Sequence, residues 1–373
     1  MRLRCEPHPR SKRSAKLVLS VDGKDVSGLS VHAAPMRIGS AEVHMGGIGG
    51  VWTDRHHRRK GYASIVMSES IDWMRERGFD VSVLFGIPDF YYRWGFITTL
   101  SRPAVTVPTR YAETVKRTCR VRALRDADLA GYLRIYNREN AKRTASIVRR
   151  KSSWITLRMG LQWGEKPTAF ACVKGGTLVG VAAYTLRPDM VACVDLCART
   201  PEAYGGLLHH AAALAVERRV EKIAFHIPTD HAFADFCREQ GCAAEVNTPR
   251  CSGGMARIIN QQQTFAKAAA ALSERVAATH LATWSGTVDV ATDLETTRLV
   301  VKRGKVSLGK PVGRARVKLR CPQERLTQLL FGFQSIAFLR AHGTAKLTGR
   351  GAEDVIDALF PKGEPFMWIP DHF

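Results

Sequence analysis

Residues 48–63 read I-G-G-V-W-T-D-R-H-H-R-R-K-G-Y-A, a run that passes from apolar residues into a basic loop. A helix pattern follows over Gly61–Arg77, because four apolar residues recur on one helical face: Ala63, Met67, Ile71 and Met74. We therefore expect a strand at Gly50–Thr53, a loop at Asp54–Lys60 and a further strand at Val81–Phe85. This strand–loop–helix–strand order predicts an α/β fold.

The start of this helix is suited to binding an anion. Arg58, Arg59 and Lys60 supply positive charge, and the free N–H groups of a first helical turn favour phosphate. Gly61 lets a ligand approach the backbone without an intervening side chain. The alternative interpretation is a basic surface loop. The run is not a P-loop, because G-x-x-x-x-G-K-[ST] is absent and Gly46–Gly50 leads into a strand.

The chain contains two similar halves. Lys16–Val31 predicts a hairpin with its turn at Asp22-Gly23, and Phe170–Tyr184 repeats the layout around Gly175-Gly176. Phe-Gly-Ile-Pro at 85–88 is matched by Phe-His-Ile-Pro at 225–228. The second half opens with a strand at Val121–Leu124 and a helix, whereas only residues 1–15 precede the first hairpin. We expect that the first half lacks its opening strand and helices, or that the true start lies upstream.

After residue 258 the pattern changes to a separate α+β domain. It has predicted helices at Gln261–Val276, Leu326–Leu339 and Glu353–Leu359, and an alternating strand in which Arg314, Arg316, Lys318 and Arg320 form a solvated face. The predicted domains are residues 1–118, 119–258 and 259–373.

The composition and the distribution of charge exclude several classes of protein and site. The 373 residues are 45% apolar and carry a net charge of +22, which attracts anions. The charge is spread along the chain, so it does not favour a nucleic-acid module. Nine irregularly spaced cysteines fit neither a zinc site nor a disulfide framework, and we expect reduced, mostly buried thiols and no metal. Without a long apolar run or a signal-peptide pattern, we expect no membrane span and a cytoplasmic protein.

R-x-x-G-x-A at residues 58–63, followed by Y-Y-R-W-G-F at 91–96, resembles the GNAT superfamily of N-acetyltransferases. The whole layout resembles the enhanced intracellular survival (Eis) type. The resemblance implies two tandem GNAT-like mixed-sheet domains, the first catalytic and the second degenerate, plus a sterol-carrier-protein-like α+β domain. It also implies acetyl-CoA as donor, a primary amine as acceptor and a homo-oligomer, such as a hexamer.

The resemblance also implies roles for single residues. Tyr91 is the general acid and the terminal carboxylate of Phe373 the general base. The residues implied to bind acetyl-CoA are Val51, Trp52, Thr53, Arg58, Arg59, Lys60, Gly61, Tyr62, Ala63, Ser64, Gly86 and Ile87. The second half has Glu202 at the position of Arg58 and Cys237 at that of Tyr91, so we expect one active site per chain.

Two other functions stay open. The chain could be a noncatalytic protein that holds a lipid or another small molecule on a GNAT-like scaffold. A nucleic-acid binder rests on the net charge alone.

Overall fold

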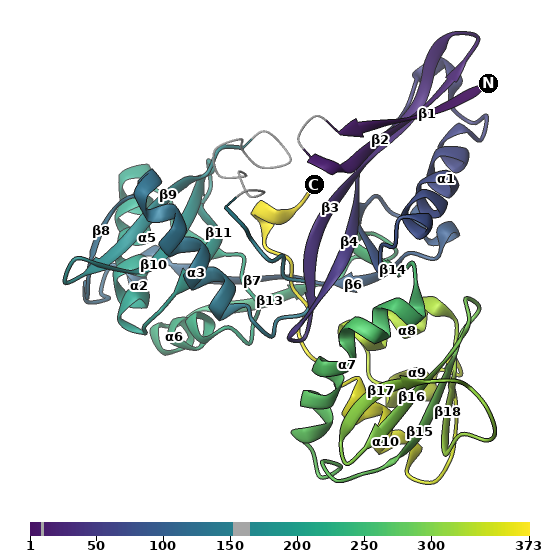
Figure 1. Ribbon diagram of the computed structural model, residues 1–373. Helices are drawn as coiled ribbons and strands as arrows, with labels where there is room; N and C mark the ends of the chain where they lie inside the picture. The colour runs from purple at the N-terminus through teal and green to yellow at the C-terminus, as the bar shows by residue number, and fades with distance from the viewer. Residues whose placement is uncertain (9–10, 152–164) are drawn as a thin grey trace.

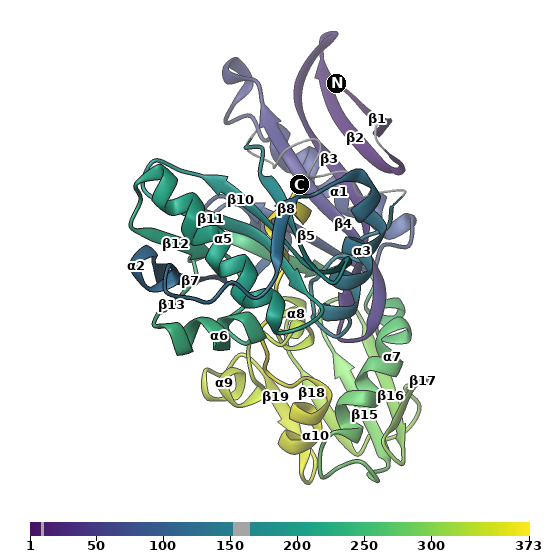
Figure 2. The same cartoon turned by 90° about the vertical axis from the view of Figure 1, so that its left-hand side faces the viewer.

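The computed structural model of the chain describes residues 1–8, 11–151 and 165–373. They form three β-sheets with helices packed on them, and the third sheet lies in a unit below the other two in both views (Figures 1 and 2). The first sheet has the order β1-β2-β3-β4-β5-β14-β6, the second β13-β7-β12-β11-β10-β9-β8, and the third β17-β16-β15-β18-β19.

The strands of the first sheet are β1 (Arg2–His8), β2 (Ser11–Val21), β3 (Lys24–Ile38), β4 (Ala41–Thr53), β5 (Val81–Gly86), β6 (Ile97–Leu100) and β14 (Gly253–Ile258). Those of the second are β7 (Arg102–Pro108), β8 (Arg120–Ala123), β9 (Thr168–Lys174), β10 (Thr177–Leu186), β11 (Val191–Ala198), β12 (Lys222–Phe225) and β13 (Ala243–Asn247). Those of the third are β15 (Gly286–Ala291), β16 (Thr296–Lys302), β17 (Lys305–Gly309), β18 (Val317–Arg320) and β19 (Lys346–Thr348).

The described α-helices are α1 (Tyr62–Glu76), α2 (Thr109–Ala112), α3 (Leu129–Glu139), α5 (Glu202–Arg218), α6 (Ala232–Gln240), α7 (Gln261–Ala277), α8 (Gln323–Phe331), α9 (Ile336–Ala341) and α10 (Ala352–Leu359). The described 3₁₀ turns are η1 (Arg55–His57), η2 (Tyr91–Trp94), η3 (Asp126–Asp128) and η4 (Ile369–Asp371).

The predicted duplication is present in the topology. Strands β1–β5 are adjacent in chain order, and β8–β12 repeat that order. Both predicted hairpins are confirmed, with left-handed backbone at Asp22-Gly23 and Gly175-Gly176. The prediction that the first half lacks an opening strand is wrong. Arg2–His8 pairs antiparallel with β2, and only residues 9–10 separate the two strands, so no helix lies between them.

The two sheets exchange strands across the boundary predicted at residue 118. Strand β7 leaves the first half and pairs with β12 and β13 of the second sheet. Strand β14 comes from the second half and pairs with β5 and β6 of the first sheet. The exchange places the two sheets side by side, and the last residues of the chain run between them (Figure 1).

The third unit joins the first sheet through α7. Thr264 donates from Oγ1 to the carbonyl of Asp80, and Lys267 Nζ lies 2.6 Å from the buried Asp80 carboxylate. The helices predicted at Gln261–Val276 and Glu353–Leu359 are confirmed as α7 and α10. The predicted basic strand face is confirmed in part: Lys318 and Arg320 alternate with buried Val317 and Leu319 in β18, whereas Arg314 and Arg316 precede the strand.

One helix predicted over Leu326–Leu339 is wrong, because the structure has two. Helix α8 ends at Gly332, whose φ of +76° is in the left-handed region, and Ser335 caps α9 by accepting from the N–H of Phe338. Gly332 also accepts from the N–H of Gly363, which fixes the start of the C-terminal tail (360–373). The apolar pattern continued across the break and concealed it.

The prediction of reduced thiols is wrong for one pair. Cys119 and Cys172 form a disulfide with their Cα atoms 6.2 Å apart. They are 53 residues apart in sequence, and the pairing of β8 with β9 brings them together. Among the other described cysteines, Cys193, Cys197, Cys237 and Cys321 are free and buried, as expected.

Replacing Gly332 with Ala should destabilise the chain more than replacing Gly343 with Ala. Both glycines have positive φ, which costs a non-glycine residue about 1–2 kcal/mol. An added Cβ at Gly332 would also lie 2.9 Å from the carbonyl oxygen of Pro361, whereas at Gly343 it meets nothing within 4 Å. We expect a further loss of about 1–3 kcal/mol for Gly332→Ala in denaturant unfolding. Equal losses would contradict the close contact.

Candidate active site

Strands β4 and β5 run parallel but stay paired over only part of their length. The pairing extends from Met45 opposite Val81 to Ile48 opposite Leu84. Beyond it, β4 continues along β3 and β5 continues along β14, so the two strands separate. A bulge in β4 includes Gly50, whose φ of +58° favours glycine. The backbone of residues 49–53 therefore borders a gap in the sheet where β5 pairs only with β14.

The basic loop follows directly from the end of β4. Asp54 accepts from the N–H of His56 and from Nδ1 of His57, which closes the η1 turn. Arg59 and Gly61 then adopt left-handed backbone, with φ of +62° and +79°. Helix α1 begins at Tyr62, and its cap residue Gly61 supplies no side chain. The first turn of α1 is therefore open to an external anion.

The cations of this loop face solvent. Arg58, Arg59 and Lys60 are all exposed, as is Gly61, where an added Cβ would meet nothing within 4 Å. Glycine is favoured at this position because the backbone has a positive φ; an added side chain would not clash with its surroundings. The predicted helix start and its charge are thus in the predicted place.

Tyr91 lies at the end of β5. It is 8% exposed, and an added Cβ at Gly86 would lie 2.5 Å from its ring, so the ring packs against the backbone of β5. Burial raises the pKa of Tyr91, which keeps the phenol protonated at neutral pH. The neighbouring Tyr92 is 51% exposed, so the two tyrosines have different surroundings.

Phe373, the last residue, lies on β4. An added Cβ at Gly47 would lie 2.5 Å from the Phe373 ring, and one at Gly49 would lie 2.9 Å from its terminal carbon. His372 stacks on Phe85 of β5 with ring centroids 3.6 Å apart. The two final side chains therefore cover β4 and β5 beside the gap, and the terminal carboxylate lies at Gly49.

Tyr91 and Phe373 approach the gap from opposite faces of the sheet. Tyr91 packs in a cluster with α1 residues and with Ile48 and Leu84. Phe373 packs with Phe85 in the cluster that contains Val83 of β5. Because side chains alternate along a strand, these clusters lie on the two faces. The gap between β4 and β5 connects them.

The other residues predicted to bind acetyl-CoA lie around the same gap. Val51 and Thr53 are half-buried in the last part of β4, and Trp52 packs against Gly28 of β3. Gly86 ends β5, and Ile87 is 62% exposed. The structure thus brings the predicted residues to one place, from the end of β4 through the first turn of α1 to the end of β5.

A cavity of about 550 Å³ lies next to the final residues. Phe85 and His372 form part of its wall, together with Arg102, Arg187 and Glu245. It lies between the first sheet, the second sheet and the C-terminal tail, on the side of Phe373.

The second half carries different groups at the positions that match Arg58 and Tyr91. Glu202, in the first turn of α5, is exposed and pairs with Lys174 at 3.3 Å. Cys237 is fully buried, and burial raises the pKa of its thiol. An acidic first turn disfavours an anion, and a buried thiol does not reach a ligand.

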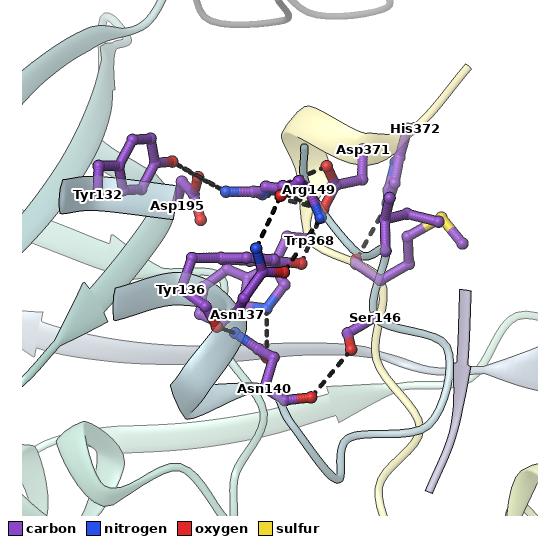
Figure 3. A network of polar contacts seen from close by, with 12 residues as sticks. Tyr132, Tyr136, Asn137, Asn140, Ser146, Arg149, Asp195, Trp368, Asp371 and His372 are labelled. Atoms are coloured by element: carbon purple, nitrogen blue, oxygen red, sulfur yellow. Dashed lines mark hydrogen bonds and ion pairs between the residues drawn. The ribbon is translucent and has the colours of Figure 1, made fainter. Parts of the chain in front are cut away.

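Sequence analysis missed a buried ionic cluster behind the tail. Arg149, with no exposed side-chain surface, bonds Asp195 of β11 at 2.6 Å and Asp371 of η4 at 2.9 Å (Figure 3). Its guanidinium also lies 3.6 Å from the ring centroid of Tyr136. Burial lowers the pKa of Arg149, but the two carboxylates raise it more, so it stays charged. Arg149-Arg150-Lys151 reads as an ordinary basic run, and nothing in it signals burial.

Within the described ranges, no helix is long and apolar enough to cross a membrane. The same residues contain no cluster of three or more His, Cys, Asp or Glu side chains that could hold a metal ion.

Residues 4–98 match the family model of the acetyltransferase (GNAT) domain. No curated protein sequence matches the chain.

Solved structures share the fold over 96% of this chain. A GCN5-related N-acetyltransferase from Anabaena variabilis ATCC 29413 has a TM-score of 0.76 at 16% identity, with 89% of its chain covered. A conserved protein from Enterococcus faecalis V583, described as a probable N-acyltransferase, has a TM-score of 0.77 at 16% identity, also with 89% covered. Eis1 from Mycobacterium abscessus has a TM-score of 0.69 at 20% identity, with 91% covered. The Eis-like fold predicted from the sequence is therefore confirmed.

Proposed function

Residues 4–98 are a GNAT acetyltransferase domain within an Eis-like fold, and on this premise we propose that the chain transfers an acetyl group from acetyl-CoA to a primary amine. In this proposal both substrates are bound together, Tyr91 is the general acid and the Phe373 carboxylate is the general base. The observation that carries the proposal is the arrangement of these two groups on opposite sides of one gap in the sheet.

The donor would lie along the α1 face. The backbone of Val51, Trp52 and Thr53 would pair with the pantetheine arm as an added strand does, because β5 has separated from β4 there. Residues Arg58–Ser64 would hold the pyrophosphate at the first turn of α1, where backbone N–H groups and three cations favour negative charge. Gly86 and Ile87 would flank the thioester.

The acceptor would approach from the face of Phe373, where Phe85 and His372 border a cavity. An alkyl amine has a pKa of about 10.4 and is a nucleophile only after losing its proton. The terminal carboxylate at Gly49 is the group that would remove that proton, directly or through water. Most of the rate enhancement would come from holding amine and thioester together.

Proton balance is completed by Tyr91. The amine nitrogen bonds to the thioester carbon, the carbon–sulfur bond breaks, and a thiolate leaves. Tyr91, kept protonated by its buried surroundings, would donate its proton to that thiolate, and the proton that the nitrogen loses as it becomes an amide would restore the phenol. A backbone N–H near Val51 would stabilise the oxyanion formed on the way.

We further propose one site per chain, because Glu202 and Cys237 replace the required residues in the second half. The domain limits of 1–118, 119–258 and 259–373, a cytoplasmic location and a homo-oligomer are part of the same proposal.

Gly61→Ala should weaken coenzyme A binding, whereas Gly23→Ala should not. Both glycines have a φ of +79° and space around the missing Cβ, so both substitutions should cost a similar 1–2 kcal/mol of backbone strain, about the value for a left-handed residue. Only Gly61 caps the start of α1. Because the strain of Gly61→Ala shifts the loop that would hold the pyrophosphate, the affinity in calorimetry should fall about tenfold. Equal affinities of the two variants for coenzyme A would contradict the proposed pyrophosphate site.

Tyr91→Phe should lower kcat by about 100-fold or more, the range of a lost general acid. Tyr92→Phe is the matched control, since its side chain is exposed beside the same turn. The measurement is free thiol released from acetyl-CoA with a panel of primary amines. Absence of amine-dependent release from both proteins would argue for the noncatalytic alternative, and amine-dependent release with an unchanged kcat in Tyr91→Phe would contradict the general-acid role of Tyr91.

A further inference from the structure

The C-terminal tail crosses the second half before it reaches the site. Glu364 accepts from the N–H groups of Thr229 and Asp230, and the N–H of Phe366 donates to the carbonyl of Thr144. The buried indole of Trp368 donates to Asn140 Oδ1 at 2.9 Å. The tail is thus bound to the degenerate half along its length, and it ends on the first sheet (Figure 1).

The strongest of these attachments is at Arg149. Its Nη1 donates to Asp195 and to the hydroxyl of Tyr132, while Nε and Nη2 both donate to the carboxylate of Asp371. Figure 3 shows the guanidinium between Asp195 on one side and Asp371 on the other. Tyr136 donates to the same Asp371 carboxylate at 3.0 Å. Asp371 is therefore held by three donor groups from two side chains.

The backbone of Arg149 is fixed as well. Asn137 of α3 accepts from the N–H of Arg149 through Oδ1 and donates to its carbonyl from Nδ2 at 2.7 Å. The guanidinium therefore has a defined position relative to α3 and β11, and Asp371 takes its position from the guanidinium.

Only His372 separates this anchor from the terminal carboxylate. Because His372 also stacks on Phe85, the last three residues are held at two points. A chain terminus is otherwise among the most mobile parts of a protein. A base that has to meet an amine within hydrogen-bond distance needs such restraint.

We propose that Arg149 is a positioning residue for acetyl transfer: by holding Asp371 it fixes the Phe373 carboxylate at Gly49. The inference rests on the proposed function. The proposal assigns a function to the second half. That half lacks the residues implied to bind acetyl-CoA, but it supplies Arg149 and Asp195. The proposal also explains why a buried charge cluster is present at a place where apolar packing would often be as stable. Bidentate bonds between charged groups fix the position of Asp371 relative to Arg149, which apolar packing does not.

The test uses Asp371→Ala in the full chain, because this change lies in the tail and leaves Arg149 paired with Asp195. Carboxypeptidase A releases C-terminal aromatic residues, so its rate of Phe373 release reports docking without any acetyl transfer. We expect release at least tenfold faster than from the unaltered chain, with unchanged affinity for coenzyme A. Asp357→Ala, which removes an exposed carboxylate of α10, should release Phe373 at the unaltered rate. An equal rate for Asp371→Ala and the unaltered chain would overturn the proposal.

Activity supplies a second measurement. In Asp371→Ala, kcat should fall about tenfold and its pH profile should shift to higher pH, where the amine loses its proton unaided. The same substitution in a chain lacking Phe373 should lower kcat no further, because the positioned carboxylate is already displaced. Equal losses in both backgrounds would mean that Asp371 acts on general stability, which overturns the proposal. Arg149→Lys keeps the positive charge but loses the planar guanidinium that bonds both carboxylates. Carboxypeptidase should therefore release Phe373 from it at a rate between those of the unaltered chain and Asp371→Ala.

Different results would contradict the proposed acetyl transfer and the positioning role of Arg149. If the unaltered chain acetylates no amine, the proposed function fails, and carboxypeptidase release still decides whether Arg149 and Asp371 hold Phe373 in place. If the unaltered chain is active and Asp371→Ala is equally active with the same pH profile, the positioning role alone fails.

Discussion

The separation of β4 from β5 after the Ile48–Leu84 pair is the constraint on which the candidate site depends. Two parallel strands that stayed paired would satisfy each other's backbone groups and close the sheet. Here β14 pairs with the far side of β5, and the bulge at Gly50 turns the end of β4 away. The gap that results is bordered by a basic helix start, a buried tyrosine and the end of the chain.

The strand exchange explains how one half can serve the other. Since β7 and β14 cross between the sheets, the second sheet is held beside the first, and the tail can run between them. Glycines 47 and 49 then make room for Phe373 on β4. In the proposed mechanism, the first half would supply the surfaces for donor and acid, while the second half and the tail would supply the terminal carboxylate with its anchor.

Features that depend on residues close together in the sequence could mostly be predicted from it. The hairpins, α1 and the position of the basic helix start at Arg58–Gly61 followed from short motifs and a family resemblance. Features made by distant residues did not: the strand exchange, the Cys119–Cys172 bond and the Arg149 cluster. The pairing of β1 with β2 is local and was also missed. The break at Gly332 was local, yet the apolar periodicity continued across it and a single glycine gives a weak signal.

Hydrogen exchange of the backbone amides with and without coenzyme A tests the central claim most directly. If the ligand pairs with the free edge of β4 and the first turn of α1, protection should rise at residues 49–53 and 58–64. The matching residues of the second half, at the start of α5, should show no change. Protection absent from residues 49–64, or appearing at α5 instead, would contradict the account.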